Sequence, residues 1–139
     1  MTQGRGATAR VWLPLVIVAL AVGCGGTGST QTTELQRIRS GSLDIVLLSA
    51  HEALRHGKDA FVVEFRSGGN LVDVGGVRLT ASMPMPGMPM FGTIDVQRTD
   101  VAGRYAATGE LGMAGTWRMT VEWDGPRGKG SVAFSGTVQ

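Results

Sequence analysis

Apolar and polar residues alternate with a period of two through most of the chain from Leu43 onward. In the clearest run, Trp117, Met119, Val121 and Trp123 are separated by polar neighbours. This alternation is typical of strands that bury one face, and turn residues recur at the spacing of about eight to twelve residues expected between short antiparallel strands. The pattern predicts about seven strands, over residues 43–49, 61–66, 77–82, 93–98, 104–111, 117–123 and 132–138.

Short strands at this spacing predict an all-β fold, namely an Ig-like antiparallel β-sandwich of about seven strands. The pattern extends over residues 43–139, a length that supports one hydrophobic core and no more. We therefore expect a single domain that covers residues 43–139.

The first 23 residues have the composition of a signal peptide. Arg5 and Arg10 precede an apolar run over residues 11–22, and the segment holds no acidic residue. That run is shorter than the about 20 residues that cross a bilayer and has the length of a signal-peptide core. We expect residues 1–23 to be a signal peptide and the rest of the chain to be exported.

Cys24, the only cysteine, follows small residues as in a bacterial lipobox, although Ala21 stands where Leu is usual. Lipidation would anchor the chain to a membrane and would remove a lone thiol, which is a liability outside the cytoplasm. The alternative is a secreted protein cut near Gly23, with Cys24 left as a free thiol. We expect a lipid anchor on the periplasmic face of the cell envelope, and Gly25, by resemblance to enterobacterial sorting signals, favours the outer membrane.

Residues 24–42 differ in composition from the domain that follows. They are rich in Gly, Ser, Thr and Gln as far as Thr33, and their only large apolar residues are Leu35 and Ile38. Such a composition is typical of a flexible linker. We expect residues 24–42 to form a tether between anchor and domain.

The net positive charge belongs to the leader. Two of the 13 Lys and Arg residues precede Cys24, which leaves 11 of them against 11 Asp and Glu in the remaining chain. No basic surface is therefore expected, and a nucleic-acid partner is excluded.

The most unusual segment is residues 83–90, in which four methionines are separated by three prolines and a glycine. Proline removes a backbone donor and fixes φ, so this segment is neither a helix interior nor a central strand. We expect a semi-rigid loop. Loops usually face solvent, where methionine is an unusual choice unless its sulfur packs against or binds something.

Strand parity extends this observation to other loops. If the strands alternate in direction, the connections after the first, third and fifth predicted strands share one pole of the sandwich. That pole would hold His51, His56, Met85, Met88, Met90 and Met113. Thioethers are soft ligands that select Cu(I), and imidazole suits copper in either oxidation state. The set predicts a Cu(I) site built from three of the methionines and a histidine.

Other interpretations of the same residues remain open. Met83 is in phase with Leu79 and Ala81, which predicts a core position, and the loop methionines could fold over the end of the sandwich as a hydrophobic cap. A partner-docking surface for an envelope protein complex is another, because methionine adapts to irregular contacts. Exposed methionines could also act as oxidant scavengers. His51 and His56 taken singly fit ordinary surface histidines.

No arrangement of residues typical of an enzyme stands out. The chain lacks a recognisable carboxylate pair, a Ser/His/Asp order, a phosphate loop and a His-x-x-x-His zinc motif. We therefore expect a protein that is not an enzyme and that has no certain cofactor besides the candidate Cu(I).

Three segments resemble the YtkA-like domain family: residues 77–85, in which a strand runs into Met-Pro, Gly103-Arg104-Tyr105, and residues 112–119, which contain Met-x-Gly-x-Trp. FixH proteins share the general pattern. The resemblance covers roughly residues 43–125 and implies an Ig-like β-sandwich in an exported or membrane-attached protein. It implies no defined activity, although several relatives are similar to parts of copper-handling and cation-efflux systems. Family members often carry His within or just after the Met-Pro segment, where this chain has Pro89 and Met90.

Overall fold

The computed structural model describes residues 31–139, so the predicted signal peptide and Cys24 lie outside the described residues. The described chain forms nine strands: β1 (Thr33–Ser40), β2 (Leu43–Ser49), β3 (Gly57–Ser67), β4 (Asn70–Leu71), β5 (Gly76–Met83), β6 (Met90–Arg98), β7 (Arg104–Leu111), β8 (Gly115–Gly125) and β9 (Gly128–Val138). The predicted all-β antiparallel fold is confirmed, and β1 and β4 raise the strand count above the expected number. Within residues 31–139, no helix is long and apolar enough to cross a membrane.

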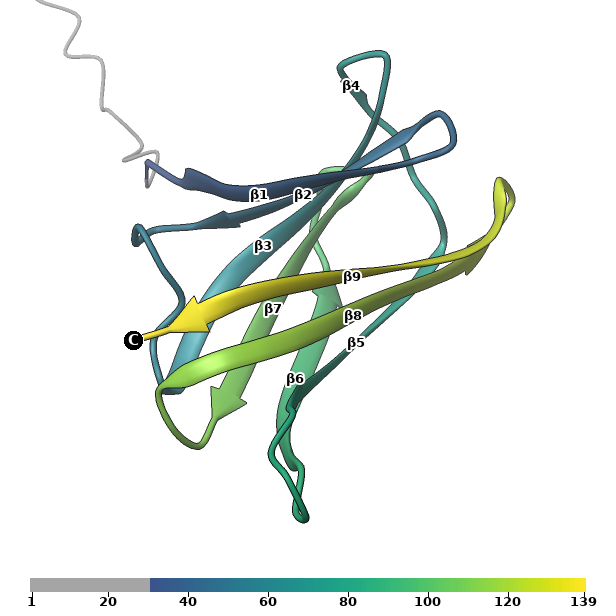
Figure 1. The fold of residues 1–139 in the computed structure, drawn as a ribbon. Helices are drawn as coiled ribbons and strands as arrows, with labels where there is room; N and C mark the ends of the chain where they lie inside the picture. The colour runs from purple at the N-terminus through teal and green to yellow at the C-terminus, as the bar shows by residue number, and fades with distance from the viewer. Residues whose placement is uncertain (1–30) are drawn as a thin grey trace, which may run out of the picture.

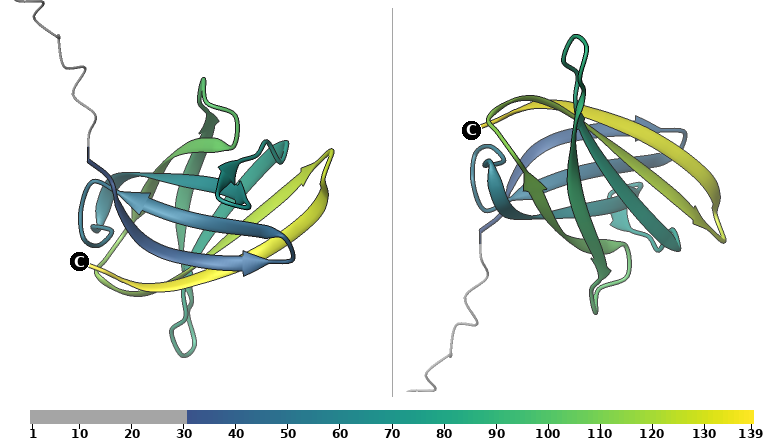
Figure 2. Two further views of the ribbon diagram at one scale, coloured as in Figure 1. Left: turned by 90° about the horizontal axis from the view of Figure 1, so that it is seen from above. Right: turned by 90° about the horizontal axis from the view of Figure 1, so that it is seen from below.

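The strands follow one path in the order β1-β2-β3-β7-β6-β5-β8-β9, and β4 pairs with β3 beside this path. The path curls until its two edge strands, β1 and β9, approach each other without pairing, so the sandwich is a nearly closed barrel (Figures 1 and 2). β5 and β6 pair only from Ala81 to Met83, at the end where their hairpin turns. Beyond those pairs β5 continues along β8 and β6 along β7, which makes this hairpin a corner between two sheet layers.

The inward positions of the strands fill one core. Trp117, Met119, Val121 and Trp123 of β8 are all buried, as their alternation predicts. The ring of Phe65 contacts those of Tyr105 and Trp123 edge-on, with ring centroids 5.5 Å apart in both pairs. Edge-to-face packing is the favoured geometry of aromatic pairs, and it joins β3, β7 and β8 across the barrel.

The prediction of a flexible tether over residues 24–42 is wrong for its last part, because residues 33–40 form β1, which pairs with β2. A bulge between Glu34 and Gln36 shifts the register, so Leu35 and Ile38 both pack against the core although they lie three residues apart. A bulge adds one residue to a strand and breaks its period of two. This break conceals the strand in the sequence.

The connections β2–β3, β5–β6 and β7–β8 lie at one pole, as strand parity predicts. Gly57 at the start of β3 pairs with Leu111 at the end of β7, and Thr93 near the start of β6 pairs with Glu110. The short β4 leaves this parity unchanged, since it only folds back on the end of β3 at the opposite pole. Near that opposite pole, the hydroxyl of Tyr105 and a guanidinium N–H of Arg98 both donate to the carbonyl of Gly75, at 2.8 and 2.9 Å.

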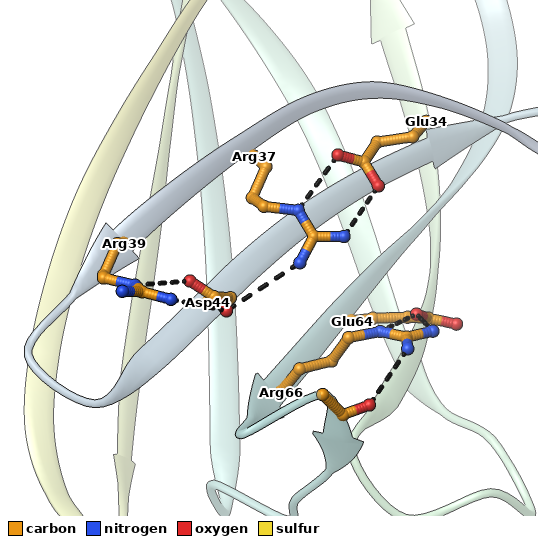
Figure 3. Close-up of polar contacts among 7 residues, drawn as sticks. Glu34, Arg37, Arg39, Asp44, Glu64 and Arg66 are labelled. Carbon is orange, nitrogen blue, oxygen red and sulfur yellow. Dashed lines mark hydrogen bonds and ion pairs between the residues drawn. The ribbon is translucent and has the colours of Figure 1, made fainter.

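Ion pairs cover the outer surface of β1, β2 and β3 (Figure 3). At their centre the carboxylate of Glu64 is fully buried and accepts hydrogen bonds from two guanidiniums, with the Nε atoms of Arg66 and Arg104 both at 2.8 Å. Beside it, Asp44 accepts hydrogen bonds from Arg39, and this contact holds the pKa of Asp44 below its ordinary value. Because Glu64 and Arg104 lie on paired strands, their contact fastens β3 to β7.

Replacement of Glu64 by Gln should lower the free energy of unfolding by about 2–3 kcal/mol. That is less than the about 3–5 kcal/mol lost when a fully buried pair is broken, because the side chains of Arg66 and Arg104 are 31% and 42% exposed. Urea unfolding monitored by tryptophan fluorescence measures the change. The exposed Glu122→Gln on β8 serves as the matched control and should shift stability by less than about 0.5 kcal/mol. Equal effects of the two substitutions would contradict this role of Glu64.

Candidate functional site: a thioether hairpin

Residues 83–90, here called the thioether hairpin, read as a near-palindrome around Pro86-Gly87. Met83 pairs with Met90 in the ladder, and continuing this register places Met85 opposite Met88. The turn falls at Pro86-Gly87, where Gly87 has φ 84°. Pro followed by Gly at positive φ is the signature of a type II turn, whose first and fourth Cα atoms lie within about 7 Å. The turn therefore holds the backbones of Met85 and Met88 close together.

The four methionines continue the core face of the sheet. Leu79, Ala81 and Met83 are the buried, inward residues of β5, and a period of two assigns Met85 to the same face. On the returning strand Met88 and Met90 share this face by the same rule. The hairpin projects from the body of the barrel (Figures 1 and 2). The row of inward side chains therefore continues along the hairpin as two pairs of methionines, Met83 with Met90 and Met85 with Met88.

The base of the hairpin is packed. The methyl group of Met83 lies 2.8 Å from the place a Cβ would occupy at Gly115, and that of Met90 lies 3.3 Å from the corresponding place at Gly112. Met83 and Met90 pack against the glycines that lie at and just before the start of β8. The predicted core position of Met83 is thus confirmed, and the cap interpretation fits Met83 and Met90.

The tip of the hairpin is not covered. Met88 is 75% exposed and Met85 is 38% exposed, and Phe91, which follows Met90 at the base of the hairpin, is 77% exposed. Met113 on the β7–β8 connection is 42% exposed, and its carbonyl accepts a hydrogen bond from the indole Nε1 of Trp117 at 2.9 Å. These residues are four of the five exposed large hydrophobic side chains in residues 31–139. A cap that shields the core would leave none of them in water.

The structure places the histidines and the methionines of the predicted mixed site on different connections of the same pole. His51 and His56 lie on the β2–β3 connection, which the views in Figures 1 and 2 separate clearly from the thioether hairpin. From β3 to β5 the sheet order passes through β7 and β6, so three strand spacings of about 4.8 Å intervene at the pole. His56 instead fixes the chain end: its backbone N–H donates to the carbonyl of Gln139 at 2.6 Å, and its Nδ1 lies 2.9 Å from the same oxygen.

The donor set of the hairpin is therefore thioether alone. Within residues 31–139, no group of three or more His, Cys, Asp or Glu residues is placed to hold a metal ion. Methionine sulfur is a soft ligand that prefers Cu(I) to harder ions. The sequence analysis did not identify Phe91 as an exposed residue. Its position could have indicated this, because it alternates with the inward Met90 and Gly92 and therefore points outward.

Peroxide should oxidise the methionines in order of exposure. Met88 should react first, Met85 and Met113 next, and the buried Met83 and Met119 last, because sulfoxide formation requires access to sulfur. Peptide mass spectrometry over a time course measures the order. Oxidation of Met83 as fast as that of Met88 would contradict the packed base and free tip of the hairpin.

Comparisons with known proteins give the family from one match and the fold from another. The model of the YtkA-like family matches residues 39–122, which include the Met-Pro, Gly-x-Tyr and Met-x-Gly-x-Trp segments. No curated protein matches the chain.

Among solved structures, a DUF4426 family protein from Pseudomonas aeruginosa is similar with a TM-score of 0.50 at 13% identity, over 74% of this chain and 93% of that chain. A copper-bound variant of FetP from uropathogenic Escherichia coli gives a TM-score of 0.45 at 8% identity, over 78% of this chain and 97% of that chain. At these identities the similarity to the DUF4426 family protein concerns the fold alone.

Proposed function

The chain belongs to the YtkA-like family, and we propose that it is a non-catalytic binding module of the bacterial cell envelope whose thioether hairpin binds Cu(I). One observation carries the proposal: Met85 and Met88 flank a tight turn in solvent, on the same face as Met90 and next to the β7–β8 connection that bears Met113. Such a module would hold copper for, or pass it to, a membrane system.

The hairpin is suited to a soft cation. Two thioethers come from the tip, and a third comes from Met90 or Met113. The methyl group of Met90 lies 3.3 Å from the place of a Cβ at Gly112, the chain neighbour of Met113. Pro84, Pro86 and Pro89 restrict the backbone, so less conformational entropy is lost when the sulfurs converge on an ion. Outside the cytoplasm, thioethers also have the advantage that they form no disulfides.

Replacement of Met85, Met88 and Met90 together by Leu should abolish Cu(I) binding and preserve the fold, since leucine keeps the apolar volume and lacks the sulfur. Anaerobic titration of Cu(I) against a chromogenic chelator measures the binding. The wild type should compete for one equivalent, and the triple variant should lose at least about tenfold in affinity, which is 1.4 kcal/mol.

The buried Met119→Leu is the matched control, because it removes a sulfur from the core of the same sheet. It should bind Cu(I) like the wild type. Failure of the wild type to compete, or equal competition by the triple variant, would refute the copper function.

A docking surface for an envelope protein complex is the second candidate, favoured by Phe91, which leaves a large aromatic ring in water at the base of the hairpin. Exposed apolar patches of this kind often mark interaction sites. The two candidates respond differently to substitution. The Met-to-Leu triple variant keeps an apolar tip and would still dock, whereas Phe91→Ser would weaken docking and leave the sulfurs in place.

The envelope location rests on the leader. An apolar run over residues 11–22 precedes Cys24, and we propose that Cys24 carries a lipid that anchors the module. The outer membrane is the favoured site of the anchor.

Replacement of Cys24 by Ser should move the protein from the membrane fraction to the soluble fraction of the cell and should abolish labelling by a radioactive fatty acid. Immunoblots of cell fractions measure the change. Ser29→Ala, which alters a hydroxyl nearby, is the control and should remain with the membranes. A wild-type protein found free in the periplasm would show instead that Cys24 is not lipidated.

A further inference from the structure

A second feature of the barrel, distinct from the thioether hairpin, is a cavity of about 300 Å³ at the seam between β1 and β9. Its lining is mainly apolar, and the apolar side chains there include Leu47, Leu54, Leu111, Trp117, Met119 and Phe134. An apolar cavity of about 150 Å³ stays dry and takes benzene. The cavity at the seam is about twice that size and reaches the volume at which small-molecule sites begin.

A missing side chain on β9 opens this cavity. Gly136 shares the inward phase of Phe134 and Val138, both buried, and it pairs with the buried Trp117 of β8. A Cβ placed on Gly136 would meet no atom within 4 Å. Two other inward strand glycines are closely packed, since a Cβ on Gly92 would lie 2.6 Å from Leu111 and one on Gly130 would overlap the ring of Trp123. Gly136 is itself exposed, so it leaves an opening to solvent at an inward position of β9.

The seam keeps this opening accessible. β1 bulges at Leu35, and both Leu35 and Gln36 border the cavity. Because β1 and β9 approach without pairing, no ladder of hydrogen bonds closes the barrel there. The end of the seam is fixed by the backbone N–H of Gln139, which donates to the carbonyl of Leu54 at 2.8 Å. The opening therefore lies between two unpaired edge strands, and a backbone hydrogen bond fixes one end of it.

The negative charge of Glu52 at the cavity favours some ligand head groups over others. Glu52 is the only charged residue that lines it within the described chain, and the other polar side chains there are Gln36, Ser135 and Thr137. A carboxylate at the mouth repels an anionic head group and attracts a cationic one. The hydroxyls and amides accept a neutral alcohol.

We propose that this cavity is a binding site for a single-chain amphiphile with a cationic or neutral head group, whose tail passes Gly136 and lies against Trp117 and Met119. The site needs no metal, and the thioether hairpin contributes none of its walls.

The experiment measures displacement of the neutral fluorophore N-phenylnaphthylamine from the purified protein by decylammonium, decanol and decanoate. Decylammonium and decanol should displace the fluorophore, and decanoate should be at least about tenfold weaker. Glu52→Gln should remove most of the difference between decylammonium and decanoate, because it deletes the charge and keeps the shape of the side chain.

Gly136→Leu should fill the cavity, lose at least about tenfold in affinity for decanol and keep or raise the melting temperature, since it adds packing in open space. Ser131→Leu, at an exposed position of the same strand outside the cavity lining, is the matched control and should bind normally. The proposal is overturned if none of the three ligands displaces the fluorophore, if decanoate binds best, or if Gly136→Leu binds decanol like the wild type.

Discussion

At Gly92, β6 lies very close to two side chains, Leu111 at the end of β7 and Trp117 near the start of β8. The rest of this pole of the barrel depends on that close packing. A Cβ at Gly92 would lie 2.6 Å from the Cδ2 atom of Leu111 and 3.3 Å from the ring of Trp117. Atoms do not approach so closely without displacement, so a larger residue at position 92 would have to shift these side chains. This contact fixes the direction in which β6 and β5 leave the body, and the thioether hairpin continues in that direction.

The short pairing between β5 and β6 has the same origin. Their ladder holds only from Ala81 to Met83, after which β5 follows β8 and β6 follows β7. Strands that divide between two layers bury their inward side chains between those layers, and their common hairpin extends beyond the core. The apolar stripe of the strands then has no opposing layer at Met85 and Met88. Their exposure is a consequence of the corner, and the prolines keep them from collapsing onto the barrel.

Much of this fold could be predicted from the sequence, because β5 and β8 keep an unbroken period of two from Leu79 to Met83 and from Trp117 to Trp123. β1 could not, because its bulge places Leu35 and Ile38 at a spacing that suggests no strand. Parity placed the histidine and methionine connections at one pole correctly. It carries no information on distance around a barrel, and three strand spacings separate β3 from β5 there.

The seam cavity shows a different limit of sequence reasoning. The sequence alone predicts that Gly136 occupies an inward position of its strand, since it falls midway between the inward Phe134 and Val138. Glycine in a strand usually marks a bulge or a close backbone approach, and Gly92 and Gly130 in this chain are such close approaches. Only the surroundings of each residue distinguish them from Gly136, because a Cβ at Gly130 would overlap the ring of Trp123 and one at Gly136 meets nothing.

Trp117 lies between Gly92, beside the thioether hairpin, and the seam cavity. Its indole N–H donates a hydrogen bond to the carbonyl of Met113, and one ring edge packs on Gly92. The Trp117 side chain also lines the seam cavity. A buried ring fixed from two sides does not move without breaking a hydrogen bond and opening a void. A ligand that enters existing space beside Trp117 leaves the ring where it is, and an ion at the hairpin tip acts on side chains that already stand in solvent. We therefore expect the two proposed sites to bind independently, since coupling requires an element with two arrangements and Trp117 is held by contacts on both sides.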